Sequence, residues 1–279
     1  MELFRGLRKE ERRTALEQKR DERQTALRAV LIVIAIAALL AIAWCSWYLV
    51  QYYRGAKQGQ DVQDLGMRDT PIIDMTAMPE FVTIPVDFEA LQEMNPDICA
   101  WITIPGTAVN YPVVHREGDD AFYMNHSSDG AYYSGGSIYS EDCNATDFTD
   151  PMTVLYGHNL RNGTMFHQLN DFADVTVFTE HPNIYVYLPD RALVYVIFSV
   201  GPHSNEHLIA NHDYTDREDF EKFYSDLKET RAMSAQFRDD QFPVFGKDRV
   251  LVLSTCFRGD NHQRFLVMGR LVAEIPAKS

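Results

Sequence analysis

Two stretches near the end of the chain decide its fold: Arg249-Val-Leu-Val-Leu-Ser-Thr-Cys256 and Arg264-Phe-Leu-Val-Met-Gly-Arg-Leu-Val272. Each contains a short run of β-branched and other apolar residues, which is typical of a buried strand. The residues between them at 259–261 are Gly-Asp-Asn, which favour a turn. We therefore expect a hairpin-like pair of strands, with the thiol of Cys256 at the end of one strand and the guanidinium of Arg264 at the start of the next.

A nucleophilic thiol needs an acid or a base beside it, and His158 is the candidate for that role. It follows the apolar pair Val154-Leu155, and its neighbours Gly157 and Asn159 place it on a turn at a strand end. The guanidinium of Arg264 is planar and keeps its proton, so it suits a developing oxyanion or a substrate carbonyl. A thiol, an imidazole and a guanidinium at strand ends are the parts of a thiol acyl-transfer site.

An ordered set of motifs is similar to that of the sortases, the membrane-anchored cysteine transpeptidases of Gram-positive bacteria. Leu253-Ser-Thr-Cys256, with Arg264 following eight residues after the cysteine, resembles the active-site signature of that family. Residues 156–166, Tyr-Gly-His-Asn-Leu-Arg-Asn-Gly-Thr-Met-Phe, resemble the histidine motif of class B sortases. Three further stretches of the chain resemble motifs near the start of the class B catalytic domain: Asn95-Pro-Asp-Ile-Cys-Ala-Trp-Ile102, Ile104-Pro-Gly106 and Asn110-Tyr-Pro-Val-Val114. The resemblance runs from about residue 85 to residue 272, in family order.

The resemblance implies a reaction and its partners. Cys256 attacks a peptide carbonyl, Arg264 stabilises the oxyanion, and His158 protonates the departing amine. The donor is a secreted protein that bears a C-terminal sorting signal, of the Asn-Pro-x-Thr-Asn kind for class B. The acceptor is an amine of a peptidoglycan precursor or a pilin lysine. We also expect Asn159, Thr255 and Ser254 to contact the substrate, and we expect no cofactor and no metal ion.

The N-terminal part of the chain has the pattern of a signal-anchor. Residues 1–28 hold nine Lys/Arg against six Asp/Glu, and residues 29–50 follow with no charge. Twenty-two helical residues suffice to cross a hydrocarbon layer of about 30 Å. Aromatic residues crowd the C-terminal end of this span, as at a membrane interface. The positive-inside rule puts the tail in the cytoplasm and the rest outside a cell membrane, so the span contacts lipid.

The remainder divides into a stalk at 51–85, rich in Gly and Pro, and a catalytic domain at 86–279. Short strands separated by turn formers between residues 101 and 138, and five later strands, predict a mainly β, closed or nearly closed barrel. The later strands are expected at 152–156, 183–188, 192–201, 249–255 and 264–273. Asp87 is the expected N-cap of a helix ending near Met94, and Thr215 with Glu218 forms the capping box of another. The family resemblance makes this the eight-stranded sortase-type β-barrel with additional helices.

The charge of the chain, −14 overall, argues against a nucleic-acid partner because no basic patch is present. The acidic pairs Asp119-Asp120 and Glu141-Asp142 are interpreted as solvated surface, since Ca²⁺ needs convergent carboxylates. His203 and His207 are four residues apart, but Pro202 argues against a zinc-binding helix there.

The other cysteines and two other classes of protein complete the set of hypotheses. Cys45 lies in the span, and Cys99 and Cys143 are interpreted as structural, with a disulfide between them left open. One alternative is an anchored adhesion domain with Cys256 inert in the core, where cysteines are usually found. The other is a secreted protease, either cysteine- or metal-dependent. Thiol labelling of the folded protein tests the first, and the reaction products test the second.

Overall fold

The computed structural model describes residues 2–66, 73, 79–258 and 260–278. Gly259 of the expected turn, and residues 67–72 and 74–78 of the expected stalk, lie outside the described residues. The chain divides into two compact units, Met1–Tyr53 and Arg54–Ser279.

The first element is a helix, α1 (Glu2–Gly66), which contains the expected membrane span. Its segment Gln18–Arg54 is long and apolar enough to cross a membrane, which is compatible with an anchor. The helix continues past residue 50 into the expected stalk and through two glycines, Gly55 and Gly59. Each glycine costs only about 1 kcal/mol in a helix, and the first proline, which costs about 3, comes at Pro71. Glycine content alone therefore did not predict where this helix ends.

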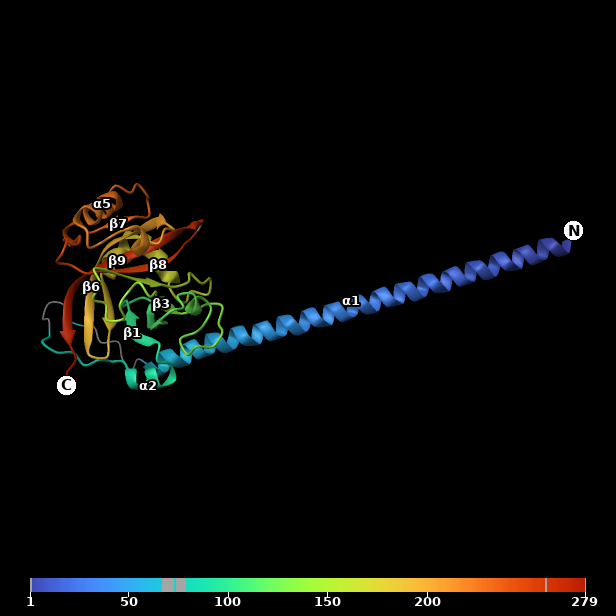
Figure 1. Ribbon diagram of the computed structural model, residues 1–279, viewed down its shortest axis with the longest axis horizontal. Helices are drawn as coiled ribbons and strands as arrows, with labels where there is room; N and C mark the ends of the chain where they lie inside the picture. Colours follow the sequence, from blue (N-terminus) through green and yellow to red (C-terminus); the bar gives the residue numbers. More distant parts are fainter. Residues whose placement is uncertain (1, 67–72, 74–78, 259, 279) are drawn as a thin grey trace. The chain divides into compact units, whose positions relative to one another are not determined.

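Eight strands form a closed barrel, as expected (Figure 1). Their order around the ring is β5-β1-β2-β3-β4-β8-β9-β6, and the pairing of β6 with β5 closes it. A short ninth strand, β7 (Gln236–Phe237), pairs with β6 beyond the end of β5. The ring strands are β1 (Ile98–Thr103), β2 (Asn110–His115), β3 (Ile138–Ser140), β4 (Met152–Tyr156), β5 (Asn183–Tyr187), β6 (Arg191–Ser204), β8 (Val250–Phe257) and β9 (Asp260–Pro276).

The register of three strands brings one rim of the barrel together. Strand β4 runs parallel to β8, with Tyr156 opposite Ser254, so the two strands end at the same rim. Strand β9 runs antiparallel to β8, with Arg264 directly opposite Cys256. The expected hairpin-like pair is therefore present, and residues that follow β4 lie beside the end of β8.

The buried apolar side chains of the described residues form three clusters. The largest fills the barrel with buried side chains such as Leu253, Phe265 and Val267, each of which contributes about 1.5–3 kcal/mol when fully buried. A second cluster lies under the helix α2 (Phe88–Met94) and includes Val82, whose N–H donates to the carbonyl of Pro276. Packing against the barrel therefore begins before residue 86, the expected start of the domain.

The helices outside the barrel are short, and their caps follow local chemistry. Asp87 caps α2 as expected, because its carboxylate accepts from the Ala90 N–H at 3.1 Å. The cap of α5 is Asp216 rather than Thr215, whose hydroxyl donates to Asp213 instead. A carboxylate competes well with a hydroxyl for an N-cap position. The remaining helices are α2 (Phe88–Met94), α3 (Val175–Glu180), α4 (Leu208–Asn211), α5 (Arg217–Lys228), and the 3₁₀ helices η1 (Phe122–Met124), η2 (His167–Ala173) and η3 (Asp239–Gln241).

Candidate active site

The thiol of Cys256 lies near the end of β8 and is half-buried. Its partner is Arg264, whose Nη1 donates to Sγ at 3.1 Å. The contact follows from the antiparallel register, which sets these two residues opposite each other. A guanidinium donor directed at sulfur favours negative charge on that atom, which is the reactive form of a cysteine.

Arg264 differs from most other arginines of the domain because no carboxylate pairs with it among the described residues. A guanidinium has five N–H donors, and among the described residues the hydrogen bond of Arg264 is the single contact to the thiol. Donors of Arg264 therefore stay available for a further acceptor beside Sγ.

The imidazole of His158 lies at the same rim, two residues after the end of β4. Its Nε2 donates to the carbonyl of Met124 at 2.8 Å. Within the described part of the chain, no hydrogen bond joins this imidazole to the thiol of Cys256. The thiol and the imidazole therefore lie on neighbouring strand ends, and each has a different polar partner.

The three residues expected to contact substrate make contacts within the rim itself. Asn159 donates from Nδ2 to the Cys256 carbonyl at 2.9 Å. The hydroxyl of Thr255 donates to the carbonyl of Gly157 at 2.8 Å, and Ser254 is buried. The Ser254 carbonyl also accepts from the Gly157 N–H. These contacts tie the end of β4 to the end of β8, so they hold His158 and Cys256 in register.

Polar residues of η2 contact Asn159 and Arg258 beside the thiol, and these contacts were not expected from the sequence. His167 contacts the Oδ1 of Asn159 through Nδ1 at 2.7 Å, and its Nε2 accepts from Arg258 at 3.2 Å. Asn170 accepts from the Arg258 N–H at 2.8 Å. No local pattern signals these roles, because η2 precedes Arg258 by more than 80 residues and only the closed barrel brings them together.

Cys99 and Cys143 are both free, so no disulfide joins them. Burial raises the pKa of the Cys99 thiol to about 12, and Sγ donates to the Val113 carbonyl. Desolvation, followed by the nearby carboxylates of Glu141 and Asp120, raises the pKa of the Cys143 thiol to about 11. Neither thiol therefore has the setting of a nucleophile at neutral pH.

Glu141, Cys143 and His207 converge, with their ligand atoms within 4.8 Å of one another. The hydrogen bonds of His207 do not suit a metal ion. Its Nδ1 accepts from the Ala210 N–H at 3.1 Å, so Nε2 carries the proton that it donates to Glu141 at 2.7 Å. A metal-binding imidazole instead offers one bare nitrogen to the ion and donates from the other. The contacts fit a hydrogen-bonded pair with a thiol beside it.

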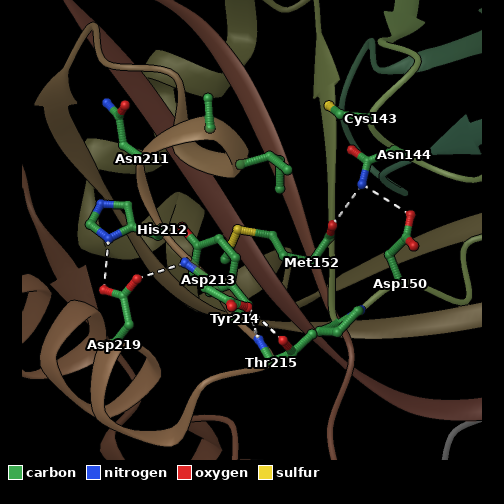
Figure 2. Close-up of a pocket in the computed structure, with 13 residues that line it drawn as sticks. Cys143, Asn144, Asp150, Met152, Asn211, His212, Asp213, Tyr214, Thr215 and Asp219 are labelled. Atoms are coloured by element: carbon green, nitrogen blue, oxygen red, sulfur yellow. Dashed lines mark hydrogen bonds and ion pairs between the residues drawn. The ribbon is translucent and has the colours of Figure 1, made fainter.

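A cavity of about 490 Å³ lies next to this cluster, and Figure 2 shows its lining. The lining includes Met152, the first residue of β4, and so lies toward the barrel end opposite His158. Its polar groups are largely paired already: Asn144 donates to Asp150 at 3.1 Å, and Asp219 accepts from the Asp213 N–H at 2.6 Å. The cavity therefore adds no reactive group to the rim that holds Cys256.

A closed eight-stranded barrel with a cysteine and an arginine opposed at one rim defines a class of cysteine transpeptidase. The family model described as the sortase domain matches residues 102–272, and the chain belongs to the sortase family. Within that family its likeness is to class B. Sortase B of Listeria monocytogenes is 27% identical over 186 residues, which is 66% of this chain and 73% of that protein.

Solved structures agree with this placement. The crystal structure of sortase B from Bacillus anthracis in complex with AAEK1 has a TM-score of 0.63 and 25% identity, and the match covers 80% of this chain and 99% of that one. The Staphylococcus aureus sortase B–substrate complex has a TM-score of 0.58 and 26% identity, covering 66% and 84% respectively. The expected family and fold are confirmed.

Proposed function

We propose that this protein is a membrane-anchored transpeptidase that cleaves a sorting signal of secreted proteins and transfers the acyl group to an amine. The observation that carries the proposal is the 3.1 Å contact between Arg264 Nη1 and Cys256 Sγ, with no carboxylate paired to Arg264 among the described residues. A guanidinium that is not neutralised by a carboxylate can stabilise charge first on sulfur and then on a substrate oxygen.

The first half-reaction forms the acyl-enzyme. The Cys256 thiolate attacks the peptide carbonyl carbon, and the carbonyl oxygen becomes an oxyanion that accepts from Arg264. The carbon–nitrogen bond then breaks, and His158 in its protonated form gives a proton to the departing amine. The product is a thioester on Cys256, with His158 neutral.

The second half-reaction reverses these roles with a new amine. Neutral His158 takes a proton from the incoming amine as its nitrogen attacks the thioester carbonyl. The tetrahedral intermediate again places its oxyanion on Arg264, the carbon–sulfur bond breaks, and the thiolate of Cys256 returns. Protons and electrons balance over the cycle, because His158 begins and ends protonated.

The partners follow from the family and from the anchor. A relative from Staphylococcus aureus is described in complex with substrate, and class B resemblance favours a sorting signal of the Asn-Pro-x-Thr-Asn kind. The amine belongs to a peptidoglycan precursor or to a pilin lysine. The helix α1 holds the domain in the cell membrane, and the basic tail at 1–28 places the domain on the outer face. Donor and lipid-linked acceptor meet there.

The test uses the full chain in detergent, a sorting peptide and a candidate amine, with products read by mass spectrometry. Ligated product supports transfer, and hydrolysis alone, with every amine tried, would assign the protein to the cysteine proteases. A chelator should change nothing. Loss of activity with chelator would favour a metal-dependent protease instead.

Alkylation of the folded protein tests the adhesion-domain alternative. At pH 8 a thiol of pKa about 12 is ionised in about one molecule in 10⁴, and a thiol of pKa about 11 in about one in 10³. We expect iodoacetamide to label Cys256 before Cys99 and Cys143. Labelling of Cys256 only after unfolding would make it an inert core residue.

A further inference from the structure

The segment 121–137, between β2 and β3, supplies the only hydrogen-bond partner that the described residues offer to the ring of His158. That partner is the main-chain carbonyl of Met124, at 2.8 Å from Nε2. Met124 is the last residue of η1, so its carbonyl belongs to a short helical turn rather than to a strand ladder. The orienting group for this imidazole is therefore part of the backbone.

A carbonyl oxygen can only accept, and this decides the tautomer of His158. The proton must reside on Nε2 in both the neutral and the charged imidazole for the contact to persist. The nitrogen that gains and loses a proton is then Nδ1. In other acid–base sites a carboxylate holds the far nitrogen of the histidine, whereas here an uncharged carbonyl does so.

Gly136 lies against this carbonyl and, having no Cβ, leaves room for it. Its φ is +61°, a conformation that favours glycine, and a Cβ built on it would lie 2.7 Å from the Tyr123 oxygen and 2.8 Å from the Met124 oxygen. The next residue, Ser137, donates its N–H to the Tyr123 carbonyl at 3.0 Å. Gly136 and Ser137, where the segment leads back to β3, therefore pack directly against the Tyr123 and Met124 carbonyls.

Side chains fix the same turn to the body of the domain. The hydroxyl of Tyr123 accepts from Asn95 Nδ2 at 2.8 Å and donates to Asp97 at 2.7 Å. Asn95 also donates to the Ser128 carbonyl at 2.7 Å. Asn95 is buried, and burial is the main cause of the raised pKa of Tyr123. Hydrogen bonds therefore hold the turn that carries the Met124 carbonyl at Tyr123, at Ser128 and at Ser137.

We propose that the Met124 carbonyl orients His158 and makes Nδ1 the proton-transferring nitrogen, and that Gly136 is the positioning residue that keeps this carbonyl in reach. The inference rests on the proposed acid–base role of His158. It adds which ring nitrogen acts and which distant residue controls it.

The matched control is a second glycine of the same segment. Gly130 has a φ of +82°, and a Cβ built on it meets nothing within 4 Å. Gly130→Ala and Gly136→Ala therefore impose comparable backbone strain in one segment, but only Gly136→Ala pushes on the Met124 carbonyl. A difference between the two variants reports the contact rather than the strain.

The experiment reads the tautomer and the kinetics of the full chain in detergent. Long-range ¹H–¹⁵N NMR of ¹⁵N-histidine-labelled protein, with His158→Ala to assign the signal, should show neutral His158 protonated on Nε2. Gly130→Ala should keep that signal and the wild-type pH profile of kcat/KM. Gly136→Ala should lose the Nε2–H preference, lower kcat/KM by about 10-fold or more, within the range that acid–base help supplies, and shift the pH profile.

Neutral His158 protonated on Nδ1 in the wild-type protein would overturn the proposal, and so would equal losses in the two alanine variants. The wild-type spectrum decides the tautomer even where Gly136→Ala fails to fold. Full activity of His158→Ala would instead remove the proposed role of His158 in catalysis. That outcome is separate, because the tautomer is measured without turnover.

Discussion

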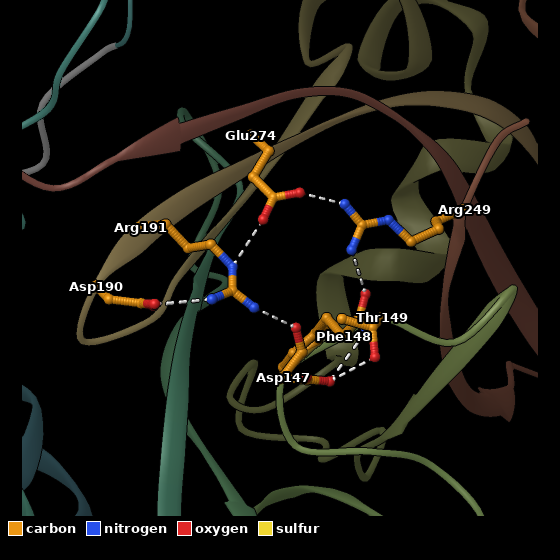
Figure 3. A network of polar contacts seen from close by, with 7 residues as sticks. All are labelled: Asp147, Phe148, Thr149, Asp190, Arg191, Arg249 and Glu274. Atoms are coloured by element: carbon orange, nitrogen blue, oxygen red, sulfur yellow. Dashed lines mark hydrogen bonds and ion pairs between the residues drawn. The ribbon is translucent and has the colours of Figure 1, made fainter.

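Arg264 at the candidate site and two arginines at the opposite end of the barrel have different kinds of partner. At the end opposite the candidate site, Arg249 and Arg191 both pair with Glu274, and Figure 3 shows the network. Arg191 also pairs with Asp190 at 2.8 Å, and Arg249 donates to the Phe148 carbonyl at 3.1 Å. At the other end Arg264 contacts the thiol of Cys256.

The register explains why these ends are distinct. Arg249 comes just before the first residue of β8, and Cys256 comes near its last. Glu274 lies near the end of β9, and Arg264 near its start. A guanidinium whose donors are taken by carboxylates and carbonyls stabilises a strand end. A guanidinium without a carboxylate partner keeps its full positive charge, and its remaining N–H donors can bind an oxyanion. The following predictions test this difference, from the largest expected effect to the smallest.

Cys256→Ala should abolish both cleavage and transfer, because it removes the atom that bonds to the substrate. The measurement is product formation from a sorting peptide by mass spectrometry. Cys143→Ala is the matched control, since that thiol is exposed, and it should turn over normally. Equal loss in a folded Cys143→Ala protein would reassign the nucleophile.

His158→Ala should lower kcat/KM by about 10²–10⁴-fold, the range that general acid–base help supplies. The fold should survive, because the ring is only half-buried and its hydrogen bond among the described residues is to a single carbonyl. Steady-state kinetics and circular dichroism measure the two expectations. His262→Ala, at an exposed position near the start of β9, serves as the control. Near-normal kinetics in His158→Ala would move the acid–base role to another residue.

Arg264→Lys should lower kcat/KM by about 10²–10³-fold, because an ammonium cannot reproduce two parallel donors to an oxyanion. Its melting temperature should stay near that of the wild type, since no ion pair with a described carboxylate is lost. Arg249→Lys is the matched substitution at the other end, and it should leave the kinetics unchanged. Equal losses of kcat/KM in Arg264→Lys and Arg249→Lys would contradict the proposed difference between the two ends of the barrel.

Glu274→Gln should leave kcat/KM unchanged and lower the free energy of unfolding by about 1 kcal/mol, since exposed or partly exposed pairs contribute about that much. The carboxylate is 41% exposed, so solvent weakens its pairs with the two arginines. For a domain of this size, 1 kcal/mol is a shift of about 2–4 °C in Tm. A large decrease of kcat/KM in Glu274→Gln would show that this ion-pair network affects catalysis at the other end of the barrel.

The sequence predicted most of the barrel because its strands carry their own signals. Val250 to Leu253 and Phe265 to Met268 are apolar runs bounded by turn formers, and both became paired core strands. The N-cap at Asp87 was predicted correctly, whereas the cap at Thr215 was wrong by one residue. The error is physical: two adjacent side chains can both cap, and only the packing of α5 decides between them.

The candidate site could be predicted only in part. Cys256, His158 and Arg264 follow from motif and strand-end position, and the structure places all three at one rim. The contacts of Asn159 could not be predicted, because its partners depend on which strands become neighbours. The Met124 carbonyl is harder still, since a backbone group leaves no signal in the identity of its residue.

The parallel pairing of β4 with β8 has a consequence for when this protein becomes reactive. Asn159 and the Cys256 carbonyl that it holds are 97 residues apart in the chain. Contacts of such long range form late and slowly, because the intervening chain must lose its freedom before the contact stabilises anything. A chain whose barrel has not yet closed therefore lacks the contacts that set His158 beside Cys256. Barrel closure is therefore the folding step that completes the candidate site.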